Sequence, residues 1–431
     1  MTAYLLERAW LPSPDGGRVH DDVLVEVAGG RFARVEIGAG DPAATRLPGL
    51  TLPGLANAHS HAFHRALRGH VQRDRGTFWT WRKQMYAVAE RLTPALYREL
   101  ATAAYREMVA AGYTTVGEFH YLHHRLDGSL HDPALAMREA LVDAAATAGI
   151  RLVLLDTAYL SSGFGAPVEG VQRRFSDGTA AAWSARAGAG PAAIHSVRAV
   201  PRHELGAFRG RAPLHVHLSE QPAENEACLA AYGLTPTGLL HAEGLLGPGT
   251  TVVHATHLTD DDIALLGRTR THVCLTPTTE RDLADGIGPG RRLADAGCRL
   301  SIGSDSHAVV DPFEELRGLE MHERLATGER GHFTAAELLD IGTAHDVLGV
   351  PDAGRIEVGA RADLVTLDAC SPRTAGTGLN GEADEHMAVF AATAADVTHV
   401  LVDGRVVHRR GDEPEVGRLL AEAIAAVRAR P

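Results

Sequence analysis

LPGLANAHSHAFHRAL, at residues 52–67, is the stretch around which the rest of the chain is organised. The apolar run from Leu50 to Leu55 predicts a buried strand with a Pro-Gly break inside it. His59 and His61 follow directly, and residues two apart on an extended segment project to the same face. Two imidazoles at a strand end form half of a metal site. The alternative is that both are surface histidines whose hydrogen bonds are satisfied without a metal, because the chain has 24 histidines.

Composition and charge limit the class of protein. With 431 residues, of which 45% are hydrophobic, the chain can bury a large core. A net charge of -12 argues against a nucleic-acid binder. The four cysteines lie far apart without a CxxC pair, which argues against a disulfide framework and a thiolate zinc site. We expect a soluble cytoplasmic protein, because the charged N-terminus does not resemble a signal peptide and no segment has the apolar length of a membrane span.

Strand-like runs occur near both ends of the chain. They are Val23–Val27, Phe32–Val35, Asp363–Asp368 and Val397–Val407, the last of which turns at Asp403-Gly404. Neither end has enough strands for an independent sheet. We therefore predict one small β-sandwich domain built from residues 1–50 and 346–431, with an amphipathic helix over residues 415–430.

Strand and helix signals alternate over residues 51–345. Further strands are expected to begin near Tyr113, Ile150, Ala192, Pro213, Thr250, Thr271 and Arg299, with helices such as Pro94–Ala111 and Pro133–Ala148 between them. Together with the strand at Leu50 this makes eight units, which predicts a (β/α)8 TIM barrel. A doubly wound open sheet is the alternative, but no GxGxxG follows a strand.

Polar residues recur where the predicted strands end, which is the end of a barrel that carries active sites. They are His59 and His61 after the first strand, Glu118, His120 and Tyr121 after the second, His195 and Arg198 after the fourth, His215, His217 and Glu220 after the fifth, His254 and His257 after the sixth, and Asp305 and His307 after the eighth. This distribution is typical of a metal-dependent hydrolase.

The pattern resembles the amidohydrolase superfamily, which has HxH after strand one, histidines after strands five and six, and aspartate after strand eight. Within it, the chain is most similar to the enzymes that convert N-formimidoyl-L-glutamate and water to N-formyl-L-glutamate and ammonia in histidine degradation. The segments that carry this similarity are NAHSHAFHRAL, FWTWRKQMY, EFHYLHH, GFGAPVEGVQRRF, IHSVRAV, HVHLSEQ, VHATHLT, PTTERDLADG and GSDSH. The resemblance also implies a homodimer.

The same resemblance implies a single zinc ion held by a set of four ligands, His59, His61, His217 and Asp305. Binuclear members of the superfamily bridge two metals with a carboxylated lysine on strand four. The only lysine of this chain, Lys83, precedes strand two, so a mononuclear site is favoured. Three imidazoles and one carboxylate leave a position for water on the metal.

Hydrolysis of an amidine needs an activated water and a proton for the departing nitrogen. Zinc makes its bound water acidic enough to react near neutral pH. Glu220, His254 and Asp305 share the proton transfers, and their division stays open. Each assignment has an alternative: Glu220 could cap the helix beginning near Pro222, and the neighbouring histidines His257 and His215 could replace His254 and His217.

A substrate with two carboxylates needs cations, the more so in a cleft expected to hold Glu118, Glu220 and Asp305. The substrate-binding residues implied by the resemblance are Arg82, Tyr121, His195 and Arg198. For Arg82 the alternative is a surface residue that extends its charge into solvent.

Two positions depart from the family pattern. His64 stands where the family has glutamine; it can still donate a hydrogen bond to a carboxylate, or it indicates another substrate. Arg281 is a second departure. The glycine-rich stretch from Ser161 to Gly178 is predicted to be a lid over the site, with a disordered insertion as the alternative.

Two other functions are considered. One is a different mononuclear deaminase acting on guanine, an adenosine derivative or a triazine, for which cationic side chains in the pocket have no evident use. The other is a metal-binding sensor or scaffold without catalysis, which would require a missing proton-transfer group, whereas Glu220, His254 and Asp305 are all present.

Overall fold

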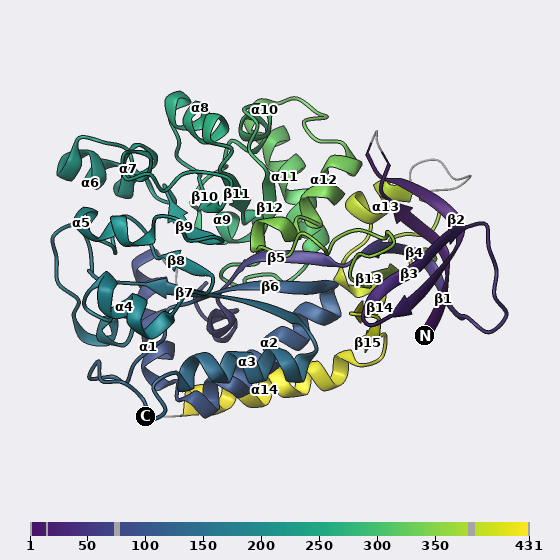
Figure 1. The fold of residues 1–431 in the computed structure, drawn as a ribbon, viewed down its shortest axis with the longest axis horizontal. Helices are drawn as coiled ribbons and strands as arrows, with labels where there is room; N and C mark the ends of the chain where they lie inside the picture. Colours follow the sequence, from purple (N-terminus) through teal and green to yellow (C-terminus); the bar gives the residue numbers. More distant parts are fainter. Residues whose placement is uncertain (1, 14–15, 73–77, 378–383, 430–431) are drawn as a thin grey trace.

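The computed structural model describes residues 2–13, 16–72, 78–377 and 384–429. Its centre is a parallel sheet of eight strands, which confirms the expected barrel (Figure 1). In order around the sheet, the strands are β5 (Leu55–Ser60), β6 (Tyr113–His120), β7 (Arg151–Ala158), β8 (Ala192–Ile194), β9 (Leu214–Leu218), β10 (Thr250–His254), β11 (His272–Leu275) and β12 (Leu300–Ile302). Strands two to eight begin within about one residue of the expected positions.

The first barrel strand differs from the prediction. The run Leu50–Leu55 is divided between two strands, because β4 (Thr45–Pro53) belongs to the flanking sheet and β5 begins only at Leu55. Gly54 lies at the break, where a Cβ atom would come within 2.2 Å of Thr114 Oγ1. The Pro-Gly pair therefore marks the passage of the chain from one sheet to the other, rather than an irregularity within one strand.

The barrel closes where its first and last strands meet. The N–H of Asp305 donates to the carbonyl of His59 at 3.0 Å, and the N–H of His61 donates to the carbonyl of Asp305 at 3.3 Å. Gly303 allows this approach, since a Cβ there would lie 2.8 Å from the Cβ of His59. The closure thus brings the histidines of the first strand against the aspartate that follows the eighth.

Helices surround the barrel (Figure 1). The α-helices are α1 (Phe78–Arg91), α2 (Pro94–Ala111), α3 (Ala136–Ala148), α4 (Ala180–Ala187), α5 (Arg202–Leu205), α6 (Pro222–Tyr232), α7 (Pro236–Ala242), α8 (Asp260–Thr269), α9 (Pro277–Leu283), α10 (Gly290–Asp295), α11 (Pro312–Thr327), α12 (Ala335–Gly342), α13 (Asp384–Phe390) and α14 (Glu413–Ala429). Short 3-10 helices are η1 (Ala62–Leu67), η3 (Gly170–Arg174), η4 (Gly206–Phe208), η5 (His345–Leu348) and η7 (Ala394–Asp396).

The helix expected at Pro94–Ala111 is confirmed as α2. Its Thr93 side chain accepts from the N–H of Leu96, and Gly112 ends it in a left-handed conformation. The helix expected from Pro133 begins at Ala136 instead, after a turn. The terminal helix α14 packs against α2 (Figure 1). Residue 430 of its expected range lies outside the described residues.

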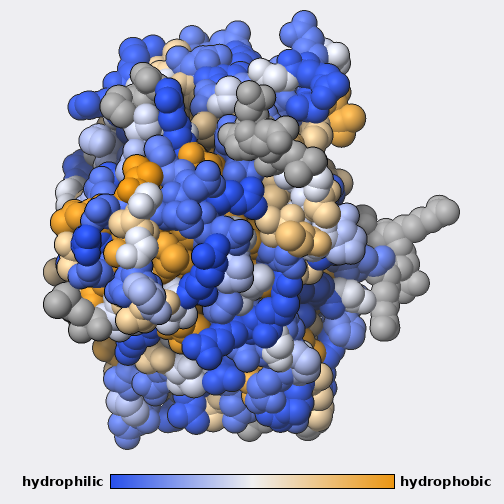
Figure 2. All heavy atoms as spheres, turned by 90° about the vertical axis from the view of Figure 1, so that its right-hand side faces the viewer, coloured by the Kyte–Doolittle hydropathy of each residue, from blue (hydrophilic) through white to orange (hydrophobic). Residues whose placement is uncertain are grey.

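A separate sheet built from both ends of the chain, expected as part of a β-sandwich, is also confirmed. Its seven strands come from both ends of the chain and form one continuous sheet in the order β15-β14-β13-β4-β1-β2-β3. Those not yet given are β1 (Thr2–Leu11), β2 (Arg18–Ala28), β3 (Arg31–Ile37), β13 (Leu364–Leu367), β14 (Val397–Val402) and β15 (Arg405–Arg409). The sheet has its own apolar core, which includes Leu6, Val25 and Leu364. On this side of the molecule the surface is mostly hydrophilic, with scattered hydrophobic residues (Figure 2).

No helix among the described residues is both long and apolar enough to cross a membrane.

Candidate active site

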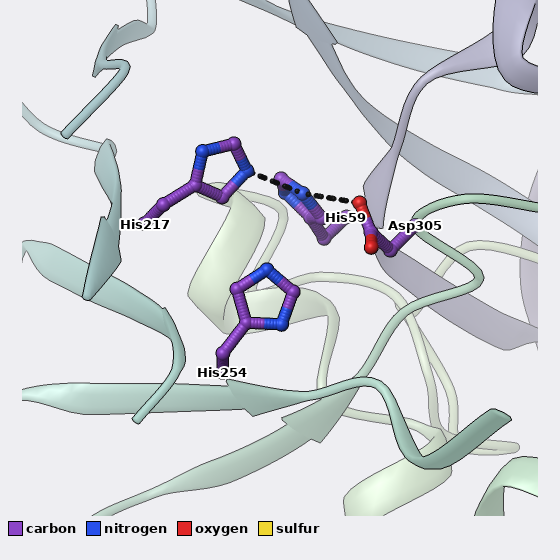
Figure 3. A group of neighbouring side chains, drawn as sticks. All are labelled: His59, His217, His254 and Asp305. Carbon is purple, nitrogen blue, oxygen red and sulfur yellow. Dashed lines mark hydrogen bonds and ion pairs between the residues drawn. The ribbon is translucent and has the colours of Figure 1, made fainter. Parts of the chain in front are cut away.

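Four buried side chains meet at the C-terminal end of the barrel strands (Figure 3). His59 comes from β5, His217 from β9 and His254 from β10, whereas Asp305 follows β12. Their potential ligand atoms all lie within 4.8 Å of one another. A second group of the same kind consists of His61, His64 and Asp305, so the two groups share the aspartate.

The shortest contacts in the cluster match the ligand spacing of a zinc ion. His59 Nε2 lies 3.0 Å from His217 Nε2 and 3.2 Å from Asp305 Oδ1. His61 Nε2 lies 3.3 Å from the same oxygen. Tetrahedral zinc with bonds of about 2.0–2.1 Å separates neighbouring ligand atoms by about 3.3 Å. These three contacts among the donors expected from the sequence are therefore close to the separation that zinc accepts, whereas the group of four whose ligand atoms all lie within 4.8 Å contains His254 in place of His61.

His254 belongs to the first of these groups and His61 to the second, and their surroundings differ. His61 Nδ1 lies 3.0 Å from the carbonyl oxygen of Phe119, an arrangement that leaves Nε2 directed at Asp305. His254 has acceptors on both sides: Nδ1 lies 3.1 Å from Thr276 Oγ1, and Nε2 lies 3.9 Å from Glu220 Oε1.

The electrostatic environment gives His254 a different pKa from the other histidines of the site. Burial lowers the pKa of His59, His61 and His217, that of His61 to about 3, so these imidazoles are neutral, as metal ligation requires. Burial also lowers the pKa of His254, but nearby carboxylates, above all Glu220, outweigh it and raise this pKa to about 10. A protonated His254 is a hydrogen-bond donor.

Backbone strain is concentrated at the same strand ends. His254 has φ of 70° and Asp305 has φ of 34°, and Ser219 and His307 are also left-handed. Residues other than glycine adopt this region at a cost of about 1–3 kcal/mol and persist there when the surrounding structure holds them. The fold therefore holds these side chains in place against their local backbone preference.

One pocket reaches the cluster from the outside. Its lining comprises His61, His64, Trp81, Arg82, Met85, Tyr86, Tyr121, Tyr159, Phe175, His195, Arg198, His217, Glu220, His254, Leu283 and Asp305. The sequence-derived substrate residues His64, Arg82, Tyr121, His195 and Arg198 are thus in one pocket with the sequence-derived catalytic residues Glu220, His254 and Asp305.

The two arginines of the pocket are held differently. Arg82 Nε donates to Tyr86 Oη at 2.8 Å. Arg198 Nε lies 3.7 Å from Glu224 Oε1, and this buried carboxylate has no hydrogen-bond partner on either oxygen among the described residues. Burial raises the pKa of Tyr159, and both guanidiniums oppose this effect. Positive charge from both arginines therefore acts on Tyr159 in the pocket wall.

His64 and Tyr121 are in contact, with Nε2 of the histidine 3.1 Å from the tyrosine hydroxyl. Burial lowers the pKa of His64 well below its ordinary value, so the ring is neutral. Nδ1 of His64 has no hydrogen-bond partner among the described residues. His64, which stands where the family has glutamine, is therefore part of the pocket wall, and its Nδ1 is available to a ligand.

The alternatives considered for His217, His254 and Glu220 do not agree with the contacts in the structure. His215 Nε2 lies 3.3 Å from the carbonyl of Val347, and His257 Nε2 lies 2.7 Å from the carbonyl of Asp285. The N-cap residue of α6 is Gln221, so Glu220 does not occupy that capping position.

The expectation that Glu118 lies in the cleft is wrong. Glu118 is buried beneath η1, where it accepts from the N–H of Ala62 and from Ser60 Oγ, each at 2.8 Å. Burial is the main influence and raises the pKa of Glu118 to about 8. Arg281 lies away from the pocket on α9 and forms an ion pair with Glu314.

The stretch from Ser161 to Gly178 contributes Phe175 to the pocket wall. It contains η3, whose Arg174 is buried and donates to the carbonyl of Leu92 at 2.8 Å. The part around η3 is therefore packed against α1 and the strand ends, unlike a disordered insertion.

Sequence reasoning missed several neighbours of the site. They are Glu224, Thr276 and Glu280, which contact Arg198 or His254, and the pocket residues Trp81, Met85, Tyr86, Tyr159, Phe175 and Leu283. A signal existed for some of them, because Trp81 and Met85, like Arg82 and Tyr86, are four residues apart on one helix and so share a face.

Comparisons with known proteins agree with this geometry. Residues 50–407 match the amidohydrolase family. Formimidoylglutamate deiminase of Pseudomonas aeruginosa is 37% identical over 440 residues, which cover 95% of each chain. A crystal structure of an amidohydrolase from Brucella melitensis superposes with a TM-score of 0.87 at 31% identity, covering 99% of this chain and 100% of that one. An adenosine deaminase from Xanthomonas campestris with bound zinc shares the fold, with a TM-score of 0.82 at 24% identity over 100% of this chain and 99% of that one.

Proposed function

This chain belongs to the amidohydrolase family and is a metal-dependent hydrolase, and we propose that it converts N-formimidoyl-L-glutamate and water to N-formyl-L-glutamate and ammonia. The observation that carries the substrate is the presence of Arg82 and Arg198 in the same pocket as the metal-ligating cluster. A glutamate derivative brings two carboxylates, and arginine binds a carboxylate through two parallel hydrogen bonds. The similarity to formimidoylglutamate deiminase over 95% of the chain supports the same substrate.

We assign one zinc ion to His59, His61, His217 and Asp305. The neutral state of the three imidazoles supports this set, as do three contacts of 3.0–3.3 Å: between His59 and His217, and from Asp305 to His59 and to His61. His254 is not included, because the acceptors around it favour a protonated ring. When bound, the zinc supplies a Lewis acid that makes water reactive near neutral pH.

The side chains around the zinc ligands carry the proton transfers. Glu220 lines the pocket beside His254, from which it can take a proton from water and return it to the departing nitrogen. His254, protonated and next to both Glu220 and Asp305, can donate a hydrogen bond to the reacting centre. Asp305 contacts two ligand histidines and can accept a proton through its other oxygen.

The specificity of binding follows from the other residues of the pocket wall. Arg82 and Arg198 receive the carboxylates, with Tyr121, His195 and His64 completing the contacts. We also propose that the enzyme acts in histidine degradation, as a cytoplasmic homodimer.

An aromatic amine is the second candidate substrate, because Trp81, Tyr121, Tyr159 and Phe175 form an aromatic wall against which a purine could stack. The deciding experiment is ammonia release by zinc-loaded protein from N-formimidoyl-L-glutamate, with guanine, adenosine and S-adenosylhomocysteine in parallel. We expect turnover of the formimidoyl substrate with kcat/KM at least about a hundredfold above the others, because a site built for polar recognition rejects analogues that leave its charges unpaired. Faster release from a purine would replace the proposal with the second candidate.

A further inference from the structure

Gln172, behind the pocket wall, uses both of its side-chain N–H groups and its side-chain oxygen in hydrogen bonds. Its side-chain N–H groups donate to Tyr86 Oη and Tyr159 Oη, each at 3.0 Å. Its Oε1 accepts from the N–H of Glu169 at 3.0 Å, which completes a capping box at the start of η3. The side chain is buried, so each bond replaces one that water would otherwise make.

The hydrogen bonds continue from Gln172 to a substrate arginine. Tyr86 Oη accepts from Gln172 Nε2 and also from Arg82 Nε at 2.8 Å. The guanidinium carbon of Arg82 lies 5.1 Å from the centre of the Tyr86 ring. Because Tyr86 orients Arg82 through both its hydroxyl and its ring, whatever fixes the Tyr86 hydroxyl also fixes the guanidinium.

The segment that carries Gln172 is itself held firmly. Next to it in the same turn, the N–H groups of His123 and His124 donate to the carbonyl of Arg174 at 3.0 and 2.9 Å. The Arg174 side chain donates to the carbonyl of His124 at 2.9 Å and to that of Leu92. Gln172 therefore projects from a rigid turn anchored to the loop after β6 and to the end of α1, and it can serve as a fixed reference for Tyr86.

We propose that Gln172 is a positioning residue that sets the direction of the Arg82 guanidinium through Tyr86, and so determines the affinity of the pocket for an acidic substrate. Gln172 is absent from the pocket lining and acts on the substrate only through its neighbours. The proposal rests on the proposed function for the nature of the substrate, a dicarboxylate. The hydrogen-bonded chain itself does not depend on that identity.

The test compares Gln172→Leu, which loses all three bonds, with Gln172→Glu, which keeps the bond to the Glu169 N–H but cannot donate to the tyrosines. The second variant covers the case in which the first does not fold. Gln84→Leu is the matched control, because Gln84 is an exposed glutamine on the same helix as Arg82. We expect both Gln172 variants to raise KM for N-formimidoyl-L-glutamate about tenfold while kcat stays within about twofold, since misplacing a binding group by about 1 Å is enough for losses of this order. Gln84→Leu should match the wild type.

The same change in an Arg82→Met background separates positioning from a general structural role. If Gln172 acts through Arg82, Gln172→Glu in that background should change KM less than about twofold. An unchanged KM in the single variants, or an equal tenfold rise with and without Arg82, would overturn the proposal.

A crystal structure of zinc-loaded Gln172→Glu distinguishes a failure of this proposal from a failure of the proposed function. If the wild type does not turn over N-formimidoyl-L-glutamate, the substrate assignment fails, and the position of Arg82 in that crystal still decides the positioning role. A displaced guanidinium that has lost its bond to Tyr86 supports the role, and an unmoved guanidinium contradicts it.

Discussion

The Nε2 atoms of His59 and His217 lie 3.0 Å apart inside the barrel, and both rings are neutral because burial lowers their pKa. Two neutral imidazoles directed at each other can share one proton between their Nε2 atoms. Asp305 Oδ1, 3.2 Å from His59 Nε2, is a further acceptor directed at the same nitrogen, and a single proton does not satisfy all three atoms. A cation shared by the three atoms satisfies all of them at once.

The first prediction is that the protein binds one zinc ion per chain. Elemental analysis of the purified active protein should return about one equivalent, and His217→Ala should lose it, because three ligands remain of four. His257→Ala is the matched control, since His257 hydrogen-bonds to a backbone carbonyl and lies outside the cluster. Two tightly bound metals per active chain would contradict the mononuclear assignment.

The second prediction concerns Glu220, which lines the pocket 3.9 Å from His254 Nε2. Glu220→Gln should keep the zinc and reduce kcat by about a hundredfold or more, because the amide has nearly the same size but cannot cycle a proton. Glu226→Gln, an exposed change on α6, serves as the control. Near-normal kcat in the zinc-loaded Glu220 variant would assign the proton transfers to other groups.

The third prediction uses the buried carboxyl of Glu118, whose pKa burial raises to about 8. Glutamate in an unfolded chain titrates near about 4.3. Between these values the folded protein holds a proton that the unfolded chain has lost, so Glu118 makes the protein less stable as pH rises from about 5 to about 8.

Glutamine at position 118 does not titrate, so Glu118→Gln lacks this loss of stability. The Tm of the variant minus that of the wild type should therefore increase by about one or a few degrees as pH rises over that range. Thermal unfolding of both zinc-loaded proteins at pH 5.5 and pH 8 measures the difference. The metal ligands are the same in both proteins, and their titration cancels. A Tm difference that is independent of pH would show that Glu118 is ionised throughout.

Much of the barrel and of the metal-ligating cluster could be predicted, because the strand and helix signals and the polar residues at the strand ends repeat along the chain. Histidines and carboxylates at successive strand ends converge in any barrel, so His59, His217 and Asp305 could be placed together from their order alone. The domain limits at residues 50 and 345 stay a prediction.

Other features have no such local pattern. Glu224 reaches Arg198 from a different element, and Gln172 reaches Arg82 only through Tyr86. Glu118, expected after the second strand, lies within β6 and points under η1, because strand residues alternate between the inside of the barrel and its cover. These contacts depend on the packing of loops and helices, for which the sequence offers no period or spacing.

The last prediction is that Arg198 selects for an acidic substrate. Losing one partner of a charge-assisted contact costs roughly 2–5 kcal/mol, so Arg198→Met should reduce kcat/KM by at least about thirtyfold without changing the zinc content. The single variant also leaves the buried Glu224 without its cation, 3.7 Å away, which could disturb the pocket by itself. Arg198→Met combined with Glu224→Gln removes that charge, and the loss should persist. Formimidoyl-glutamine, which lacks the side-chain charge, should be a poor substrate of the wild type. If it is turned over as fast as formimidoyl-glutamate, the pocket does not recognise that carboxylate, and His64, with its unpartnered Nδ1 in the pocket wall, becomes the first position to exchange for glutamine.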